Sequence, residues 1–310
     1  MSLRVLAFSD LHLNDREDIN LYPLEEEVRS RSEEKQVDVF VTLGDVIDNI
    51  PRDREKNGEL VEEDIATGRY FLEQLGEISQ RNDIQSYAIP GNHDYDIFGD
   101  MIQTANGHQI RGVNDGRGAN IVSSGDETYG FVGKDVEDFD IGPEVDPETY
   151  GIKDLDELVE EMYQVATADR SIEDAADNLD ILVEDYKQFH SDCQELVDSF
   201  EDLADSFQEV YGQADSEDTV LMSHIAPFNT NLDAKEIGRD YSSHQGSITN
   251  RVAIEHFTPG LGLNGHHDYH NIDQISRAGD YGSESYVVGI DERRPTEIVL
   301  DQGTVSVEQR

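Results

Sequence analysis

The stretch LRVLAFSDLH, at residues 3–12, places a dense apolar run, Leu3–Phe8, just before Asp10 and His12. A second run, Val37–Leu43, is followed after one glycine by Asp45. Short apolar runs rich in valine and phenylalanine indicate strands buried on both faces, as in parallel sheets. The N-terminal part of the chain is therefore predicted to contain parallel strands whose carboxyl ends carry acidic and imidazole side chains.

The segments that follow alternate between helix and strand patterns. Gly58–Ser79 has helical spacing, and Ile84–Ile89 is a third apolar run, closed by Pro90 and Gly91. This β-α-β rhythm predicts a layered α/β fold of one domain over residues 1–310. Further strands are expected later in the chain, where the sheet should be antiparallel or mixed: Ala119–Val122, Tyr129–Val132, Thr219–Met222, Leu261–Leu263, Ile272–Ser276, Ser285–Ile290, Glu297–Leu300 and Thr304–Glu308.

A segment of different character, Asp154–Tyr211, lacks proline and glycine and is strongly acidic. Across Ile172–Val210 its apolar residues recur at steps of three and four, and Cys193 occupies one of these positions. That spacing is the heptad seam of a coiled coil, with Ser171 as its N-cap. We predict a long helical, coiled-coil-like insertion over residues 150–213, which serves as an arm or a lid. The seam is compatible both with packing inside the chain and with a homodimer contact.

The bulk composition is unusually acidic. The 310 residues include 69 acidic and 23 basic side chains, which gives a net charge of −46. Self-repulsion of this size destabilises a compact state at low ionic strength. It becomes tolerable at roughly 1 M salt, where the Debye length shrinks to about 3 Å. The composition therefore predicts a halophilic source of the haloarchaeal type; the alternative is an ordinary acidic protein that binds basic partners.

Composition also narrows the partners and the compartment. Acid is spread along the whole chain and no basic stripe is present, which argues against binding of nucleic-acid phosphates. The single cysteine excludes an intrachain disulfide, which is compatible with the cytoplasm. The N-terminal apolar run is shorter than that of a signal peptide, and no stretch has the length of a membrane span. We therefore expect a cytoplasmic protein that does not enter a membrane.

Five short motifs carry the candidate chemistry, and each follows a predicted strand. Singly, an aspartate at a strand end is usually a turn residue or a helix cap, and a lone histidine is usually a satisfied polar group. Together they change the interpretation, because ligands of open α/β sheets gather beyond the carboxyl ends of the strands. The motifs are Asp10-Leu11-His12, Gly44-Asp45-Val46-Ile47-Asp48, Gly91-Asn92-His93-Asp94, Ser223-His224 and Gly265-His266-His267-Asp268.

The side chains in these motifs are suited to divalent metal ions. Asp10 and His12, two apart in an extended chain, would point to the same side and share one ion. The two oxygens of a carboxylate such as Asp45 can bridge two cations about 3.5–4 Å apart. Three more side chains add oxygen and nitrogen ligands that suit Zn, Mn, Fe or Ni, namely Asn92, His224 and His266.

The motif order D-x-H, G-D-x-x-D, G-N-H-D, S-H and G-H-x-x resembles that of the calcineurin-like metallophosphoesterases, over roughly residues 3 to 300. The resemblance implies mixed β-sheets sandwiched by helices, with the predicted insertion outside the shared pattern. It also implies two bound divalent metal ions and hydrolysis of a phosphate ester by a hydroxide that bridges them. By analogy the substrate is a small phosphorylated molecule, and a phosphodiester is preferred over a monoester.

The resemblance also implies a role for each motif residue. One ion would be held by Asp10, His12, Asp45 and the last residue of a G-H-x-H pattern. The other would be held by Asp45, Asn92, His224 and His266. His93 would be catalytic, as transition-state stabiliser or general acid, and Asp94 would orient it. Asp48 would support the ligands without binding an ion.

One position departs from the family pattern. Asp268 stands where the second histidine of G-H-x-H is expected, and His267 or His270 would substitute for it only if the loop is remodelled. We expect Asp268 to be the ligand. With this third aspartate the formal charge of two divalent ions, their carboxylates and a hydroxide falls to zero. That weakens attraction for a dianionic phosphate and favours harder ions such as Mn²⁺; the alternatives are Fe, Zn, Ni and Mg.

Two rival functions make different demands on the sequence. A non-catalytic scaffold with the same fold would be expected to lack metal ligands or His93, whereas all but one of the motif positions match. A nuclease of the same superfamily would be expected to carry a basic channel, which the net charge of −46 argues against.

The charge also predicts how stability depends on salt. We expect the free energy of unfolding to rise as KCl increases from about 0.1 M to about 1 M, because the Debye length falls from about 10 Å to about 3 Å. Urea unfolding at each KCl concentration, followed by circular dichroism, measures this dependence. Greatest stability in the low-salt buffer would contradict the halophilic interpretation.

Overall fold

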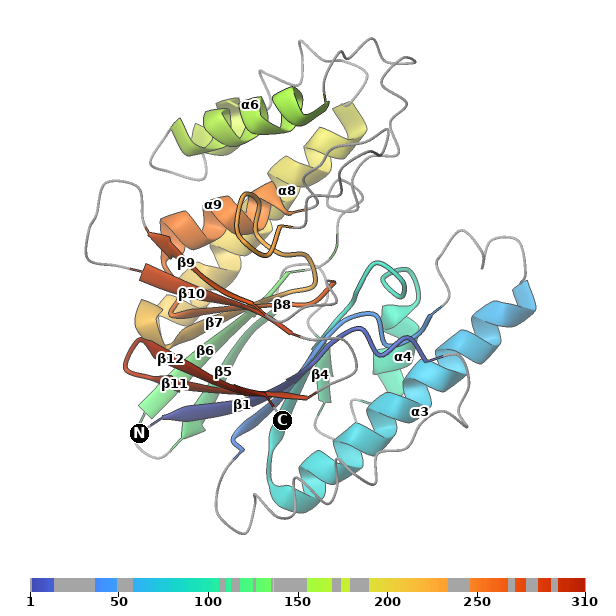
Figure 1. Cartoon of the computed structure of the whole chain (residues 1–310). Helices are drawn as coiled ribbons and strands as arrows, with labels where there is room; N and C mark the ends of the chain where they lie inside the picture. The colour runs from blue at the N-terminus through green and yellow to red at the C-terminus, as the bar shows by residue number, and fades with distance from the viewer. Residues whose placement is uncertain are drawn as a thin grey trace.

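The computed structural model describes residues 2–13, 37–48, 58–105, 110–112, 118–124, 127–134, 136, 155–168, 174–178, 190–233, 246–266, 271–276, 284–290 and 295–309. Two six-stranded sheets lie face to face in it (Figure 1). The strands of the first sheet are β1 (Leu3–Phe8), β2 (Val39–Leu43), β3 (Gln85–Ile89), β4 (Ile110–Gly112), β11 (Thr296–Asp301) and β12 (Thr304–Gln309). Those of the second are β5 (Gly118–Ser124), β6 (Glu127–Gly133), β7 (Thr219–Ser223), β8 (Leu261–Asn264), β9 (Ile272–Ser276) and β10 (Glu284–Gly289).

Each sheet contains a run of parallel strands, with antiparallel strands at one edge of the first sheet and at both edges of the second. The first has the order β12-β11-β1-β2-β3-β4, with β1 to β4 parallel and the pairings of β11 and β12 antiparallel. The second has the order β5-β6-β7-β8-β10-β9, with parallel pairing from β6 through β10 and antiparallel strands at both ends. The predicted parallel N-terminal strands and the mixed C-terminal half are therefore confirmed.

The main core lies between the two sheets and is built from their inward-facing apolar side chains. Val5, Val41 and Met222 belong to this cluster and are fully buried. The rings of Tyr87 and Phe131 stack across the interface with centroids 5.0 Å apart. Because strand side chains alternate between faces, the same runs also supply an outer apolar layer on each sheet.

Helices cover the outer face of each sheet (Figure 1). On the first sheet, α3 (Gly58–Asn82) and α4 (Phe98–Ala105) pack against Leu6, Phe40 and Ala88. On the second, α8 (His190–Tyr211) and α9 (Ile248–Phe257) pack against Val132 and Leu221. A further helix, α6 (Leu155–Ala168), lies against α9. The sequence argument did not predict β4, α4 or α9.

The C-terminal part of the acidic segment is a structural layer of the fold. Phe200, Leu203, Phe207 and Val210 of α8 are fully buried, and the last three pack with the outer face of the second sheet. These residues of the predicted seam therefore pack within the chain and are not available for a homodimer contact. Residues 179–189 and the Cys193 side chain lie outside the described part, so the continuous long helix and the dimer contact stay predictions.

Candidate metal centre

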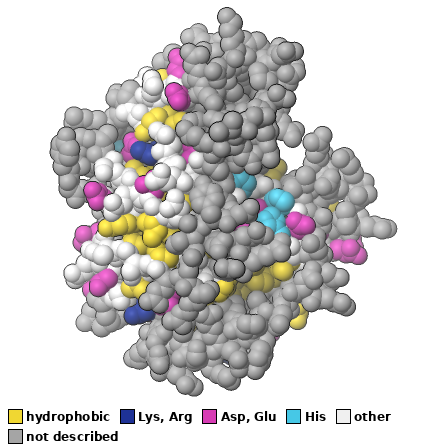
Figure 2. All heavy atoms as spheres, viewed as in Figure 1, with side chains coloured by type: hydrophobic (Ala, Val, Ile, Leu, Met, Phe, Trp, Pro, Cys, Tyr) yellow, Lys and Arg dark blue, Asp and Glu magenta, His cyan; other side chains and the backbone are white. Residues whose placement is uncertain are grey.

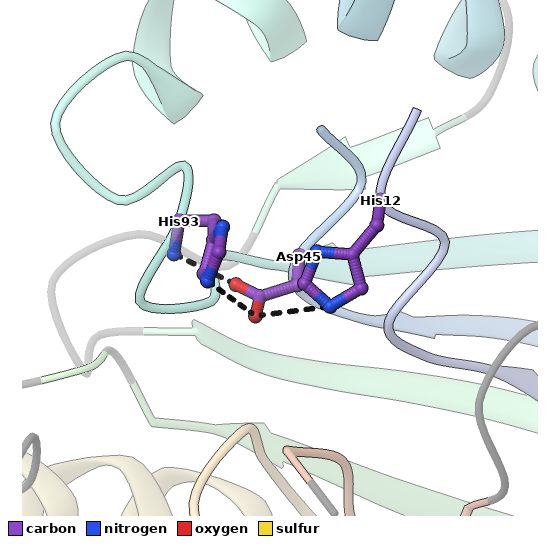
Figure 3. A group of neighbouring side chains, drawn as sticks. All are labelled: His12, Asp45 and His93. Atoms are coloured by element: carbon purple, nitrogen blue, oxygen red, sulfur yellow. Dashed lines mark hydrogen bonds and ion pairs between the residues drawn. The ribbon is translucent and has the colours of Figure 1, made fainter. Parts of the chain in front are cut away.

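The five motifs meet at one edge of the double sheet. They follow β1, β2, β3, β7 and β8, the carboxyl ends of which lie together. Figure 2 shows histidine side chains gathered at one place on the surface beside acidic ones. Figure 3 shows His12 and His93 on either side of Asp45. The described motif residues therefore lie together at one edge of the double sheet, as the sequence predicted.

Backbone hydrogen bonds join the loops after β1 and β2. The amide of Asp10 donates to the carbonyl of Gly44 at 3.2 Å, and the amide of His12 donates to that of Asp45 at 3.0 Å. The amide of Leu13 continues this pairing by donating to the carbonyl of Val46 at 2.9 Å. The two loops thus extend the parallel pairing of their strands to the residues that carry the side chains.

Four of the candidate ligands have a left-handed backbone. The φ angles are 53° at Asp10, 47° at His12, 50° at Asp45 and 69° at His266. This region is sparsely populated by residues other than glycine and costs about 1–3 kcal/mol for each residue held in it. The extended-chain argument for Asp10 and His12 is therefore wrong. The left-handed backbone at both residues brings the two side chains together, with His12 Nε2 3.9 Å from Asp10 Oδ1.

Asp45 is the hub of the site. Its Oδ2 lies 3.9 Å from His12 Nε2, 3.9 Å from His93 Nε2 and 3.3 Å from His224 Nε2. Its Oδ1 accepts a hydrogen bond from the His93 amide at 2.8 Å. The residue is 1% exposed. Asp45 therefore stands between two groups of candidate ligands and can contribute to both.

The first group consists of Asp10, His12 and Asp45. Asp10 is held by the loop after β8, because its Oδ2 accepts from the amide of His266 at 2.9 Å. His12 Nδ1 lies 3.4 Å from Asp48 Oδ1, on the side of the ring away from the two carboxylates. The predicted fourth ligand, Asp268, and its alternatives His267 and His270 lie outside the described residues.

The second group consists of Asp45, Asn92, His224 and His266. His224 Nδ1 donates to the carbonyl of Leu43 at 2.6 Å, which leaves Nε2 facing Asn92 Oδ1 at 2.8 Å. A backbone carbonyl behind a histidine is the arrangement that fixes a metal-binding tautomer. The ligand atoms of Asp45, His224 and His266 all lie within 4.8 Å of one another.

The electrostatics of this group indicate that it is built around a cation. Burial disfavours a charged His224, but the Asp45 and Asp10 carboxylates outweigh it and raise the pKa of His224 to about 10. Burial also opposes ionisation of Asp45, yet His224 and His93 hold its pKa below the ordinary value. Burial raises the pKa of Asp10. The acceptor atoms around His224 Nε2 thus converge on one positive charge, which a divalent ion supplies in place of the proton.

His93 and Asp94 have separate tasks. The Nδ1 of His93 donates to the carbonyl of Asp48 at 2.6 Å, and Nε2 points toward Asp45. Both oxygens of the fully buried Asp94 accept from backbone amides, those of Gly91 at 2.7 Å and Val46 at 2.8 Å. Burial and the nearby Asp45 raise the pKa of Asp94 to about 7. The Asp48 carbonyl therefore holds the His93 ring and Asp94 ties two loops together, while the expectation that Asp94 orients His93 stays a prediction.

Two buried asparagines that the sequence argument missed hold the loop after β7. Asn250 Nδ2 donates to Ser223 Oγ at 2.5 Å and to the Ile225 carbonyl at 2.8 Å, and Asn264 Nδ2 donates to the same carbonyl at 3.1 Å. Ser247, which caps α9 by accepting from the amide of Asn250, was the available sequence signal for this helix.

A layered α/β fold with aspartate and histidine side chains clustered at one rim provides a candidate metal-binding site. The family model for calcineurin-like phosphoesterases matches residues 3–275, and the chain belongs to that family. The resemblance stated from the motifs is thereby confirmed. Family membership supports metal-dependent hydrolysis of a phosphoester, with divalent ions held by the clustered aspartate and histidine side chains.

Solved structures share the fold at low sequence identity. One crystal structure matches with a TM-score of 0.52 and 15% identity, covering 100% of this chain and 99% of its own. The protein TT1561 of Thermus thermophilus matches with a TM-score of 0.51 and 13% identity, over 100% and 99% of the two chains. A dimetal phosphatase from Danio rerio has a TM-score of 0.48 and 13% identity, over 99% and 96%. The first two confirm the predicted fold class.

Comparison with curated proteins by sequence gives no match. Within the part of the chain that the structure describes, no helix is both long enough and apolar enough to cross a membrane.

The glycine loops of the site tolerate no side chain. A Cβ on Gly91 would overlap the side chain and the amide of Asp45, whereas a Cβ on Gly212 would meet nothing closer than 3.6 Å. We expect Gly91→Ala to displace Asp45, weaken metal binding and destabilise the fold by about 1–3 kcal/mol. Calorimetric titration with Mn²⁺ and urea unfolding measure the two effects.

The matched control is Gly212→Ala, which should leave both quantities close to those of the wild type. Wild-type metal affinity in Gly91→Ala would show that the position of Asp45 does not depend on this close approach.

Proposed function

We propose that the protein hydrolyses a phosphodiester at a dinuclear site centred on Asp45. The observation that carries the proposal is the position of this carboxylate, whose Oδ2 lies 3.9 Å from His12 Nε2 and 3.3 Å from His224 Nε2, so that one oxygen is shared by the two ligand groups. One ion would be held by Asp10, His12, Asp45 and Asp268, and the other by Asp45, Asn92, His224 and His266. When bound, such ions supply Lewis acidity, orient the phosphoryl group and lower the pKa of water.

The protein's own contribution begins with His93. Because a carbonyl oxygen only accepts, the contact with Asp48 at 2.6 Å fixes a hydrogen on Nδ1. Nε2 is then the nitrogen that gains and loses a proton, and it points toward Asp45. We propose that His93 acts there as a general acid and donates a proton to the departing oxygen, a role that contributes about 10²–10⁴-fold in rate.

The charge of the site supports a diester and Mn²⁺. With Asp268 as a ligand, the formal charge of two divalent ions with their carboxylates and the attacking hydroxide is zero. A phosphodiester carries one negative charge and a monoester carries two near neutral pH, so the neutral site favours the diester. A ligand set with several carboxylate oxygens favours a harder ion such as Mn²⁺ over Zn²⁺.

The acidic composition supports the proposed setting. We propose a cytoplasmic protein of a halophile that acts on a small phosphorylated molecule and not on nucleic acid, since the net charge is −46. The scaffold alternative receives no support from the described residues, which bring His93 and six of the seven predicted metal ligands together.

The proposal is tested by a panel of aryl phosphates in Mn²⁺ and high KCl. We expect hydrolysis of bis(4-nitrophenyl) phosphate to exceed that of 4-nitrophenyl phosphate in kcat/KM. His93→Ala should lower kcat by about 10²–10⁴-fold without changing metal content. His256→Ala, at the end of α9, is the matched histidine control and should keep wild-type activity. Absence of hydrolysis of both esters, or full activity in His93→Ala, would refute the enzyme proposal.

The role of Asp268 has a separate test. We expect Asp268→Ala to lose one of two bound ions. The group formed by Asp45, Asn92, His224 and His266 is unchanged, whereas the first group is left with three ligands, Asp10, His12 and Asp45. Metal analysis of protein reconstituted with Mn²⁺ measures the number of ions per chain. Two ions per chain in Asp268→Ala would exclude Asp268 as a ligand.

A further inference from the structure

Helix α6 contacts the loop that carries His224 through Tyr163. The side chains of Met162 and Ala166 form the buried face of this helix and are 0% and 1% exposed, whereas the Tyr163 side chain is half-buried. The Tyr163 ring packs on the Phe228 ring with centroids 5.1 Å apart and an interplanar angle of 47°. Phe228 is itself buried, so this contact is a fixed part of the packing.

The Tyr163 hydroxyl is tied to α9. It donates to Glu255 Oε1 at 2.8 Å, and the same oxygen accepts from Arg251 Nε at 2.6 Å. The guanidinium carbon of Arg251 lies 5.8 Å from the centre of the Tyr163 ring, within the range of a cation–π contact. Burial raises the pKa of Tyr163 to about 12, which keeps the hydroxyl a donor.

Arg251 then reaches the same loop. Its Nη1 donates to the carbonyls of Phe228 at 3.4 Å and Asn229 at 3.3 Å. Asn229 has a left-handed backbone with φ 54°, and its amide donates to Asp233 Oδ2 at 2.8 Å. Tyr163 therefore acts on the loop twice, directly through Phe228 and indirectly through Arg251.

This loop, His224–Asp233, begins with a metal ligand. At its start His224 is held against the first sheet by the carbonyl of Leu43. Four residues later, Phe228 is held by α6 and α9. The contact between Tyr163 and Phe228 thus lies four residues from His224. A displacement of α6 would move Phe228, and through the loop backbone it would act on the His224 imidazole, which faces Asn92 and Asp45.

We propose that Tyr163 is a positioning residue for the second ligand group, and that it couples the predicted helical insertion to the metal centre. Tyr163 contacts the loop, not the ions or a substrate. By fixing Phe228, and by holding Glu255 and Arg251 in the geometry that binds the loop carbonyls, it adds a restraint at Phe228 to those that Asn250 and Asn264 place on the loop at Ile225. The inference rests on the proposed function only for the identity of the ions, and its test measures binding and exchange, not turnover.

Tyr163→Ala removes the ring and the hydroxyl together. In Mn²⁺ titrations we expect the apparent Kd of one ion to rise about tenfold, the lower end of the effect of residues that support metal ligands. The other ion should bind as in the wild type, because Asp10 and His12 are not touched. Hydrogen exchange of the His224–Asp233 loop should become faster in the metal-loaded protein.

Tyr163→Phe keeps the ring contact with Phe228 and the cation–π contact but loses one hydrogen bond. It should restore most of the affinity, with a residual loss of about threefold, because a single hydrogen bond has a modest net effect. Tyr211→Phe is the matched control. The Tyr211 hydroxyl donates to the carbonyl of Phe257 at 2.5 Å, at the last residue of the same helix α9 and two residues after Glu255. This variant should leave both Kd values and the loop exchange unchanged.

Wild-type affinity for both ions in Tyr163→Ala would overturn the inference. An equal loss in Tyr211→Phe would also overturn it, by showing that any destabilisation of α9 has the same effect. If the wild type binds two ions but hydrolyses no phosphate ester, the proposed function fails while the Tyr163 test still gives an answer.

Discussion

The buried carboxylate of Asp45 is the constraint around which the rest of the site is arranged. A charge removed from water is stable only when an opposite charge and hydrogen bonds compensate it. Here the compensation comes from His224 and His93, which belong to two separate loops. The Asp45 and Asp10 carboxylates raise the pKa of His224, which favours a positive charge at this point, and a divalent ion would supply more of it.

That arrangement depends on where the two sheets end. Parallel strands in both sheets bring their carboxyl ends to one edge, so the loops after β1, β2, β3, β7 and β8 meet there. The loops approach so closely that Gly44 and Gly91 have no room for a Cβ. The left-handed backbone at four ligands is strain that the paired loops hold in place. Precision in the site thus comes from the strand ends and not from the acidic surface.

The acidic segment between β6 and β7 serves the fold as well as the surface. Its last helix, α8, buries Leu203 and Phe207 against the outer face of the second sheet. Its first described helix, α6, reaches the metal centre through Tyr163 and the His224–Asp233 loop. A segment recognisable only by composition in the sequence is therefore joined both to the core and to the chemistry.

The sequence by itself determined the described strands other than β4, the family and the candidate ligand residues. Apolar runs fix buried strands locally, and each motif stands directly after a run, so Asp10, Asp45 and His224 are identifiable without coordinates. The tertiary structure decided what depends on approach between distant loops. It set the left-handed backbone at Asp10 and His12, the use of Asp94 as a tie between loops, and the contact of Tyr163 with Phe228. Local patterns carry no information on such approaches, because they arise from how separate strand ends and helices pack.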